Sequence, residues 1–116
     1  MTSLSELRIF LCVQPTNMRF SFDTLMGRAE QIFEQDPLSG HLFLFLNRRR
    51  DRLKILFWDQ DGFCILYKRL EAGTFGLPKV EAGDQRVELD AGQLRRLLAG
   101  IDLQGGWKRK RYRRPS

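Results

Sequence analysis

Three apolar runs of strand length, separated by two short polar turns, constrain the fold of this chain most strongly. The runs span residues 42–46, 53–58 and 63–70, and the turns between them span residues 47–52 and 59–62. Strand-length apolar runs that alternate with polar turns are typical of a β-meander. The second turn is predicted to be a four-residue hairpin loop in which Gly62 adopts the left-handed conformation.

The pairing around the second turn fixes which side chains share a face. If Trp58 and Phe63 flank this turn, Lys54 lies opposite Tyr67 and Arg52 lies opposite Arg69. One face of the hairpin is then apolar apart from Lys68 and carries Leu53, Ile55, Phe57, Cys64, Leu66 and Leu70. The first helix is expected to cover this apolar face.

Two amphipathic helices are predicted to accompany the sheet. The first has six apolar residues on one helical face: Phe22, Leu25, Met26, Ala29, Ile32 and Phe33. Ser21 is its expected N-cap, and Asp36-Pro37 is expected to end it, because the residue before a proline is pushed out of helical geometry. The second begins with a capping box at Asp90 and Gln93. Its buried stripe is predicted to be Leu94, Leu97, Leu98 and Ile101.

The remaining segments complete an α+β prediction. The apolar run at residues 8–13 predicts a further strand, and the glycine-containing stretch 72–88 predicts a loop with one or two short strands. We therefore expect a small, mainly antiparallel β-sheet packed with two α-helices. Residues 1–103 are predicted to form this single domain, and residues 104–116 to form a flexible basic C-terminal tail.

The positive charge is concentrated in that tail. The net charge is +6. The tail holds six of the twenty Lys and Arg residues, which leaves fourteen to balance the fourteen Asp and Glu residues of the remaining chain. A basic arm on a neutral body indicates binding to a phosphate backbone, although a solubilising end would have the same composition. No apolar run is long enough to cross a membrane, and no signal peptide is evident, so the protein is expected to be cytoplasmic.

Catalysis, metal binding and a cofactor are not expected. His41 is the single histidine, and its place at a strand entrance favours a structural role. Cys12 and Cys64 are too far apart for a paired zinc motif, and they are expected to be buried and reduced. Asp59 and Asp61 are explained by turn formation. The sequence therefore predicts a protein that is not an enzyme.

The candidate site is a set of cations and one tyrosine that the hairpin geometry brings to one rim, together with the tail. A rim of this kind gives phosphate affinity without sequence specificity, although an acidic protein surface would be attracted equally. The predicted nucleic-acid-binding residues are Arg48, Arg49, Arg50, Arg52, Lys54, Tyr67, Lys68 and Arg69 in the rim, and Lys108, Arg109, Lys110, Arg111, Arg113 and Arg114 in the tail.

The same block resembles one family specifically. The matching residues are Asn17-Met18-Arg19, Phe22-Asp23, Leu25, Asp36-Pro37, Ser39-Gly40, Leu42-Phe43, Phe45, Asn47-Arg48-Arg49, Asp51-Arg52, Lys54, Trp58-Asp59, Gly62, Tyr67-Lys68-Arg69-Leu70-Glu71, Gly73, Phe75 and Pro78. This pattern is similar to the second-reading-frame accessory protein, TnpB, of the insertion-sequence-66 family of bacterial transposable elements. Within the first of these runs, Asn17 is the one departure, since the family more often has aspartate at this position.

The resemblance implies a role in DNA transposition beside a separate, larger transposase that carries the catalytic acids. It supplies no active-site residue. Two hypotheses follow. In the first, this non-catalytic accessory protein binds element DNA through the arginine-rich rim and the tail. In the second, it is an adaptor that binds the transposase without contacting DNA.

Overall fold

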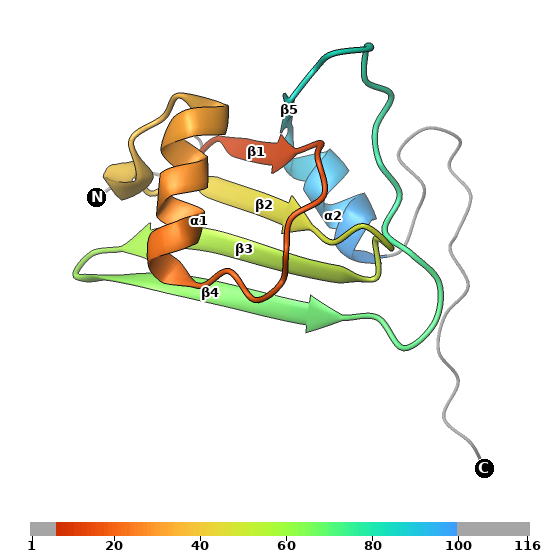
Figure 1. Ribbon diagram of the computed structural model, residues 1–116, viewed down its shortest axis with the longest axis horizontal. Helices are drawn as coiled ribbons and strands as arrows, with labels where there is room; N and C mark the ends of the chain where they lie inside the picture. The colour runs from red at the N-terminus through yellow and green to blue at the C-terminus, as the bar shows by residue number, and fades with distance from the viewer. Residues whose placement is uncertain (1–6, 100–116) are drawn as a thin grey trace.

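A five-stranded sheet with one helix on each face forms the protein (Figure 1). The computed structural model describes residues 7–99, and residues 1–6 and 100–116 lie outside this range. The strands are β1 (Ile9–Cys12), β2 (Leu42–Leu46), β3 (Arg52–Asp59), β4 (Gly62–Arg69) and β5 (Arg86–Leu89). The helices are α1 (Phe22–Arg28), continued by a π-helical turn (Ala29–Phe33), a 3-10 turn (Pro37–Ser39) and α2 (Ala91–Ala99).

The sheet has the order β4-β3-β2-β1-β5. The only parallel pair in the described range is β1 with β2, and the other three pairs are antiparallel. The α+β prediction and its mainly antiparallel sheet are therefore confirmed. Stretch 72–88 contributes the start of one strand, β5, which lies beside β1 at the opposite edge from the meander.

The predicted register of the β3–β4 hairpin is confirmed. Trp58 pairs with Phe63, Lys54 with Tyr67 and Arg52 with Arg69. The prediction for the turn itself is wrong. The strands run to Asp59 and resume at Gly62, so the loop has two residues, and Gln60 adopts the left-handed conformation with φ 55°. Gly62 is already in the strand, paired with Asp59, and has no need of a positive φ.

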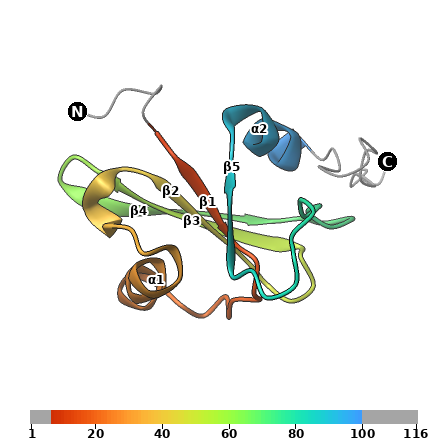
Figure 2. The ribbon, with the colours of Figure 1, turned by 90° about the horizontal axis from the view of Figure 1, so that it is seen from above.

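The two helices lie on opposite faces of the sheet, as the view from above shows (Figure 2). The prediction that the first helix covers Leu53, Ile55 and Phe57 is wrong. These side chains pack in the cluster that contains Leu97 of α2. Helix α1 and its π-helical turn instead cover an aromatic cluster on the other face, made of buried Phe10, Leu25, Ala29, Phe33, Phe43, Phe45 and Leu56 together with Cys12.

Both helices begin where predicted, and the first ends before Asp36-Pro37, with different details at the two N-termini. The capping box of α2 is confirmed, because Gln93 donates from its backbone to Asp90 at 2.7 Å and accepts from Asp90 N–H at 2.9 Å. Ser21 occupies the N-cap position of α1 but makes no side-chain capping bond. At the other end, Glu34 takes a left-handed conformation and Asp36 caps the following 3-10 turn.

Several predictions concern residues outside the described range. These are the domain boundary near residue 103, the place of Ile101 in the α2 stripe, and the tail from residue 104. Between residues 7 and 99, no helix is long and apolar enough to cross a membrane. Cys12 is buried, Cys64 is half-buried, and neither forms a disulfide.

Candidate functional site

The arginine-rich turn between β2 and β3 is held by Asn47 and Asp51. The Asn47 side-chain oxygen accepts from the backbone N–H groups of Asp51 and Arg52, each at 3.0 Å, and its amide nitrogen donates to the Asp51 carboxylate at 2.6 Å. Arg50 takes a left-handed conformation with φ 58°. Its carbonyl accepts from the Phe75 N–H at 2.7 Å, which ties the turn to the later connection. These hydrogen bonds fix the backbone of the turn, and therefore the positions from which its arginine side chains extend.

Arg48, Arg49 and Arg50 are exposed, and none of the three forms an ion pair with any residue that the structure describes. Arg48, Arg49 and Arg52 line an open concavity of about 680 Å³ on the α1 side of the turn. Its opposite wall is the segment Pro15–Asn17 with Met18 and Phe20. The structure therefore brings part of the predicted rim around one hollow.

Arg28 belongs to the same concavity and was absent from the predicted site. It lies in the last turn of α1, half-buried, and its guanidinium stands over the Phe20 ring at 5.9 Å from the centroid. One Nη donates to the Cys12 thiol at 3.7 Å, while its buried Nε–H has no partner. One feature of the sequence does point to Arg28: it is an arginine in a helix that is otherwise predicted to pack against the sheet.

Lys54 does not belong to an exposed rim. Its side chain is 8% exposed, and the ammonium donates to the carbonyl oxygens of Met18 at 2.7 Å and Phe20 at 2.8 Å. It also lies over the Tyr67 ring at 4.8 Å from the centroid. The side chain therefore fixes the segment that walls the concavity, and in this conformation two of its three N–H donors are occupied.

Lys68 lies apart from the other predicted residues, because alternation along β4 places it on the α2 face. Its ammonium donates to the Leu98 carbonyl at 3.4 Å. Arg52, Tyr67 and Arg69 remain together on the α1 face, where Arg52 donates to the Tyr67 hydroxyl at 3.2 Å. Arg69 forms an exposed ion pair with Glu71 at 2.8 Å, which balances its charge locally. The six predicted tail residues, 108–111, 113 and 114, lie outside the described residues.

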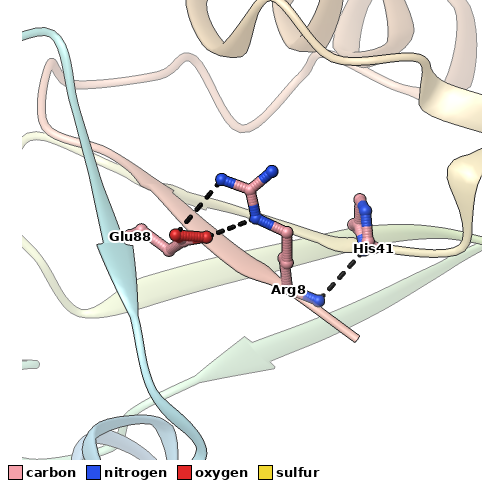
Figure 3. A network of polar contacts seen from close by, with 3 residues as sticks. All are labelled: Arg8, His41 and Glu88. Atoms are coloured by element: carbon pink, nitrogen blue, oxygen red, sulfur yellow. Dashed lines mark hydrogen bonds and ion pairs between the residues drawn. The ribbon is translucent and has the colours of Figure 1, made fainter. Parts of the chain in front are cut away.

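A second polar network joins β1, the entrance of β2 and β5 (Figure 3). Arg8 makes a forked ion pair with Glu88, and its backbone N–H donates to Nδ1 of His41 at 3.0 Å. The hydrogen bond from Arg8 lowers the pKa of Glu88. Burial lowers the pKa of His41, and the neighbouring Arg8 cation lowers it further against the opposing effect of Glu88. These contacts link the start of β1 to both of its neighbouring strands, β2 and β5.

His41 should make the folded protein sensitive to mild acid. Protonation places a hydrogen on Nδ1, where the Arg8 N–H already points, so the folded state binds this proton more weakly than the unfolded chain. The stability from the neutral imidazole is therefore complete above the usual pKa of 6.5 and declines as the pH falls below it. Urea unfolding between about pH 7.5 and about pH 5 measures this decline. A His41→Gln variant keeps an acceptor and should show a smaller decline; an equal decline would contradict the assignment.

The two-residue loop between β3 and β4 is closed through its backbone. The N–H of Asp61 donates to the Asp59 carbonyl at 2.5 Å across the two-residue loop. Across residues 7–99, no three His, Cys, Asp or Glu side chains are grouped in a way that could hold a metal ion.

Comparison with known proteins identifies the family. Residues 7–107 match the model of the family described as IS66 Orf2 like protein. The chain is 35% identical over 97 residues to uncharacterized protein y4hO of Sinorhizobium fredii (strain NBRC 101917 / NGR234), covering 84% of this chain and 83% of that protein. It is 34% identical over 113 residues to uncharacterized protein y4jC of the same strain, covering 95% and 92%. No solved structure matches. The chain belongs to the family of IS66 Orf2 like proteins, which have an accessory role in transposition.

Proposed function

We propose that this protein assists transposition without catalysing it, by binding the DNA of its element through the arginine-rich turn. The observation that carries the proposal is the convergence of Arg48, Arg49, Arg52 and Arg28 on one concavity that contains a single acidic residue, Asp51. The Asp51 carboxylate already accepts a hydrogen bond from Asn47. An anion in this hollow would therefore meet guanidinium groups in excess.

The chemistry of these groups suits phosphate. A guanidinium presents fixed pairs of N–H donors that match phosphate oxygens, and it stays charged at any physiological pH. Because the turn is anchored through its backbone, Arg48 and Arg49 can contact a phosphate strand without rearrangement of the fold. Arg52, Tyr67 and Arg69 extend the surface along β3 and β4. Arg50 is exposed in the turn before β3 and lines a separate hollow with Val13 and Leu77. We propose that the six tail cations add further phosphate contacts.

An adaptor that binds the transposase directly is the second candidate, and the open edge of the sheet favours it. Strand β4 is at the end of the strand order, and within the described range only β3 pairs with it. Two of its large side chains, Leu66 and Tyr67, are 49% and 48% exposed. An edge strand of this length with exposed apolar side chains can accept an added strand from a partner protein.

Replacing Arg48 and Arg49 by alanine should weaken binding to element-end duplexes of any sequence. Each phosphate contact that is lost removes about 0.9 from the slope of log affinity against log salt, so the double variant should lower the slope by about 2. Fluorescence anisotropy across a series of salt concentrations measures both quantities. The Arg95→Ala/Arg96→Ala variant is the matched control, because it removes the same charge from exposed positions of α2 on the opposite face.

Equal losses in the two double variants would show a non-specific effect of net charge. The tail is tested by replacing its six cations with glutamine in the full chain. Unchanged DNA affinity in both the Arg48→Ala/Arg49→Ala variant and the tail variant would refute DNA binding by these groups. A stable complex with the neighbouring transposase in the absence of DNA would then support the adaptor.

A further inference from the structure

The concavity beside the arginine-rich turn contains donors that the fold leaves unused. Thr16 is only 3% exposed, and its buried hydroxyl has no hydrogen-bond partner. The buried Nε–H of Arg28 likewise has none. Both residues line the same hollow. Buried polar groups are almost always paired, because an unpaired one loses its bonds to water without replacement.

The guanidinium of Arg28 is also without a counter-ion. No carboxylate forms an ion pair with it in the described part of the chain. The neighbouring contacts are the Phe20 ring and the Cys12 thiol, which is a weak acceptor at 3.7 Å. The edge formed by Nε and Nη2 is the side of an arginine that binds two oxygens at once. In this protein that edge has no strong acceptor.

We infer that this concavity is a discrete binding site for a single phosphate group, anchored by Arg28 and Thr16 and closed by Arg48 and Arg49. A phosphate supplies several strong acceptor oxygens together with the negative charge that Arg28 lacks. Rotation about the Cα–Cβ bond of Thr16 moves its hydroxyl to another staggered position, so the hydroxyl can turn to an oxygen in the hollow. The Lys54 bonds to Met18 and Phe20 hold the opposite wall in place.

This inference rests on the proposed function and gives it a fixed point of contact. Exposed arginines alone allow a phosphate strand to slide across the surface, because each forms a single flexible contact. A phosphate held by a half-buried arginine and a buried hydroxyl is set in one place, and this fixes the register of the strand on the protein.

The test is an NMR titration of the full-length protein with two small probes. Inorganic phosphate represents a strand end, and dimethyl phosphate represents an internal phosphodiester. With the site as inferred, the Arg28 Nε–H resonance shifts in a saturable manner with at least one probe, and the stronger probe identifies the kind of phosphate. Linear, unsaturated shifts of equal size at Arg28 and at the exposed Arg95 would overturn the inference.

Thr16→Val separates binding from folding. Valine keeps the shape of threonine and removes a hydroxyl that has no partner, so stability should be unchanged or raised. Phosphate affinity should fall about tenfold, as expected for the loss of one hydrogen bond to a charged group. Arg28→Gln should abolish saturable binding, and its fold is checked by the dispersion of the same spectra. Unchanged phosphate affinity in Thr16→Val and Arg28→Gln would overturn the site.

The same variants separate this inference from the proposed function. If duplex binding depends on Arg48 and Arg49 while Arg28 does not respond to either probe, DNA binding stands and the discrete phosphate site is refuted. If Arg28 shows saturable shifts with phosphate while duplex affinity is unaffected by the Arg48→Ala/Arg49→Ala variant, the phosphate site stands and the proposed DNA surface is refuted.

Discussion

Phe43→Ala should destabilise the protein by about 3–5 kcal/mol, because it removes a fully buried ring and leaves a cavity. The ring is 0% exposed and stacks with Phe10 and Phe33 at centroid distances of 5.8 and 5.4 Å. These three rings join β1, β2 and the π-helical turn after α1. Since small domains are stable by only about 5–15 kcal/mol, the loss is a large fraction of the total. Urea unfolding followed by circular dichroism measures it.

Phe22→Ala is the matched control for this prediction. It makes the same chemical change on α1, but the Phe22 side chain is 43% exposed, and alanine has a higher helix propensity. Its effect on the free energy of unfolding should stay below about 1 kcal/mol. A similar loss for the two variants would show that the aromatic cluster is not the centre of the core.

Local patterns in the sequence were sufficient to predict the register of the β3–β4 hairpin and the N-terminus of α2. Register in the hairpin follows from alternation and from a short turn, and one matched pair, Trp58 with Phe63, fixes all the others. The capping box depends only on Asp90 and Gln93, three residues apart. The prediction of the turn was wrong about which residue is left-handed. Because the loop has only two residues, the positive φ falls on Gln60 and not on Gly62.

The face covered by α1 could not be read from the hairpin alone. Both of its faces are apolar near the turn, with Phe57 on one and Leu56 and Phe63 on the other. The position of α1 depends on the parallel pairing of β1 with β2, since the helix then becomes the crossover of a β–α–β unit. That pairing joins segments about thirty residues apart, and periodicity within either strand does not reveal it.

Only part of the candidate site could be predicted, because the rest depends on contacts between segments that are distant in the sequence. Arg48, Arg49 and Arg52 are neighbours in sequence, so the turn gathers them at once. Arg28 reaches the hollow only because α1 crosses the face on which the turn opens, and that placement is a property of the whole fold. The sequence places Lys54 and Lys68 in the predicted binding site only because they are cations in the hairpin. Their partners are backbone carbonyls of distant segments, which composition cannot show.

Lys54→Met should destabilise the protein by about 2–4 kcal/mol. The substitution keeps most of the apolar stem and removes the ammonium, so the carbonyl groups of Met18 and Phe20 lose their donor. A buried acceptor left without a partner costs about 1–3 kcal/mol, and here two half-buried residues each lose one. Urea unfolding at neutral pH measures the change. Arg48→Met is the control, because its side chain is exposed and forms no ion pair within the described residues.

The dependence of DNA affinity on salt distinguishes a structural lysine from one that contacts phosphate. At a temperature where both variants are folded, the proposed DNA binding predicts that Arg48→Met lowers the slope of log affinity against log salt by about 0.9, since one phosphate contact would be lost. Lys54→Met should leave the slope unchanged, because its ammonium binds the wall of the hollow rather than the ligand. Any loss of affinity should then be the same at every salt concentration. A lowered slope in Lys54→Met would show instead that the ammonium leaves Met18 and Phe20 to contact phosphate when DNA binds.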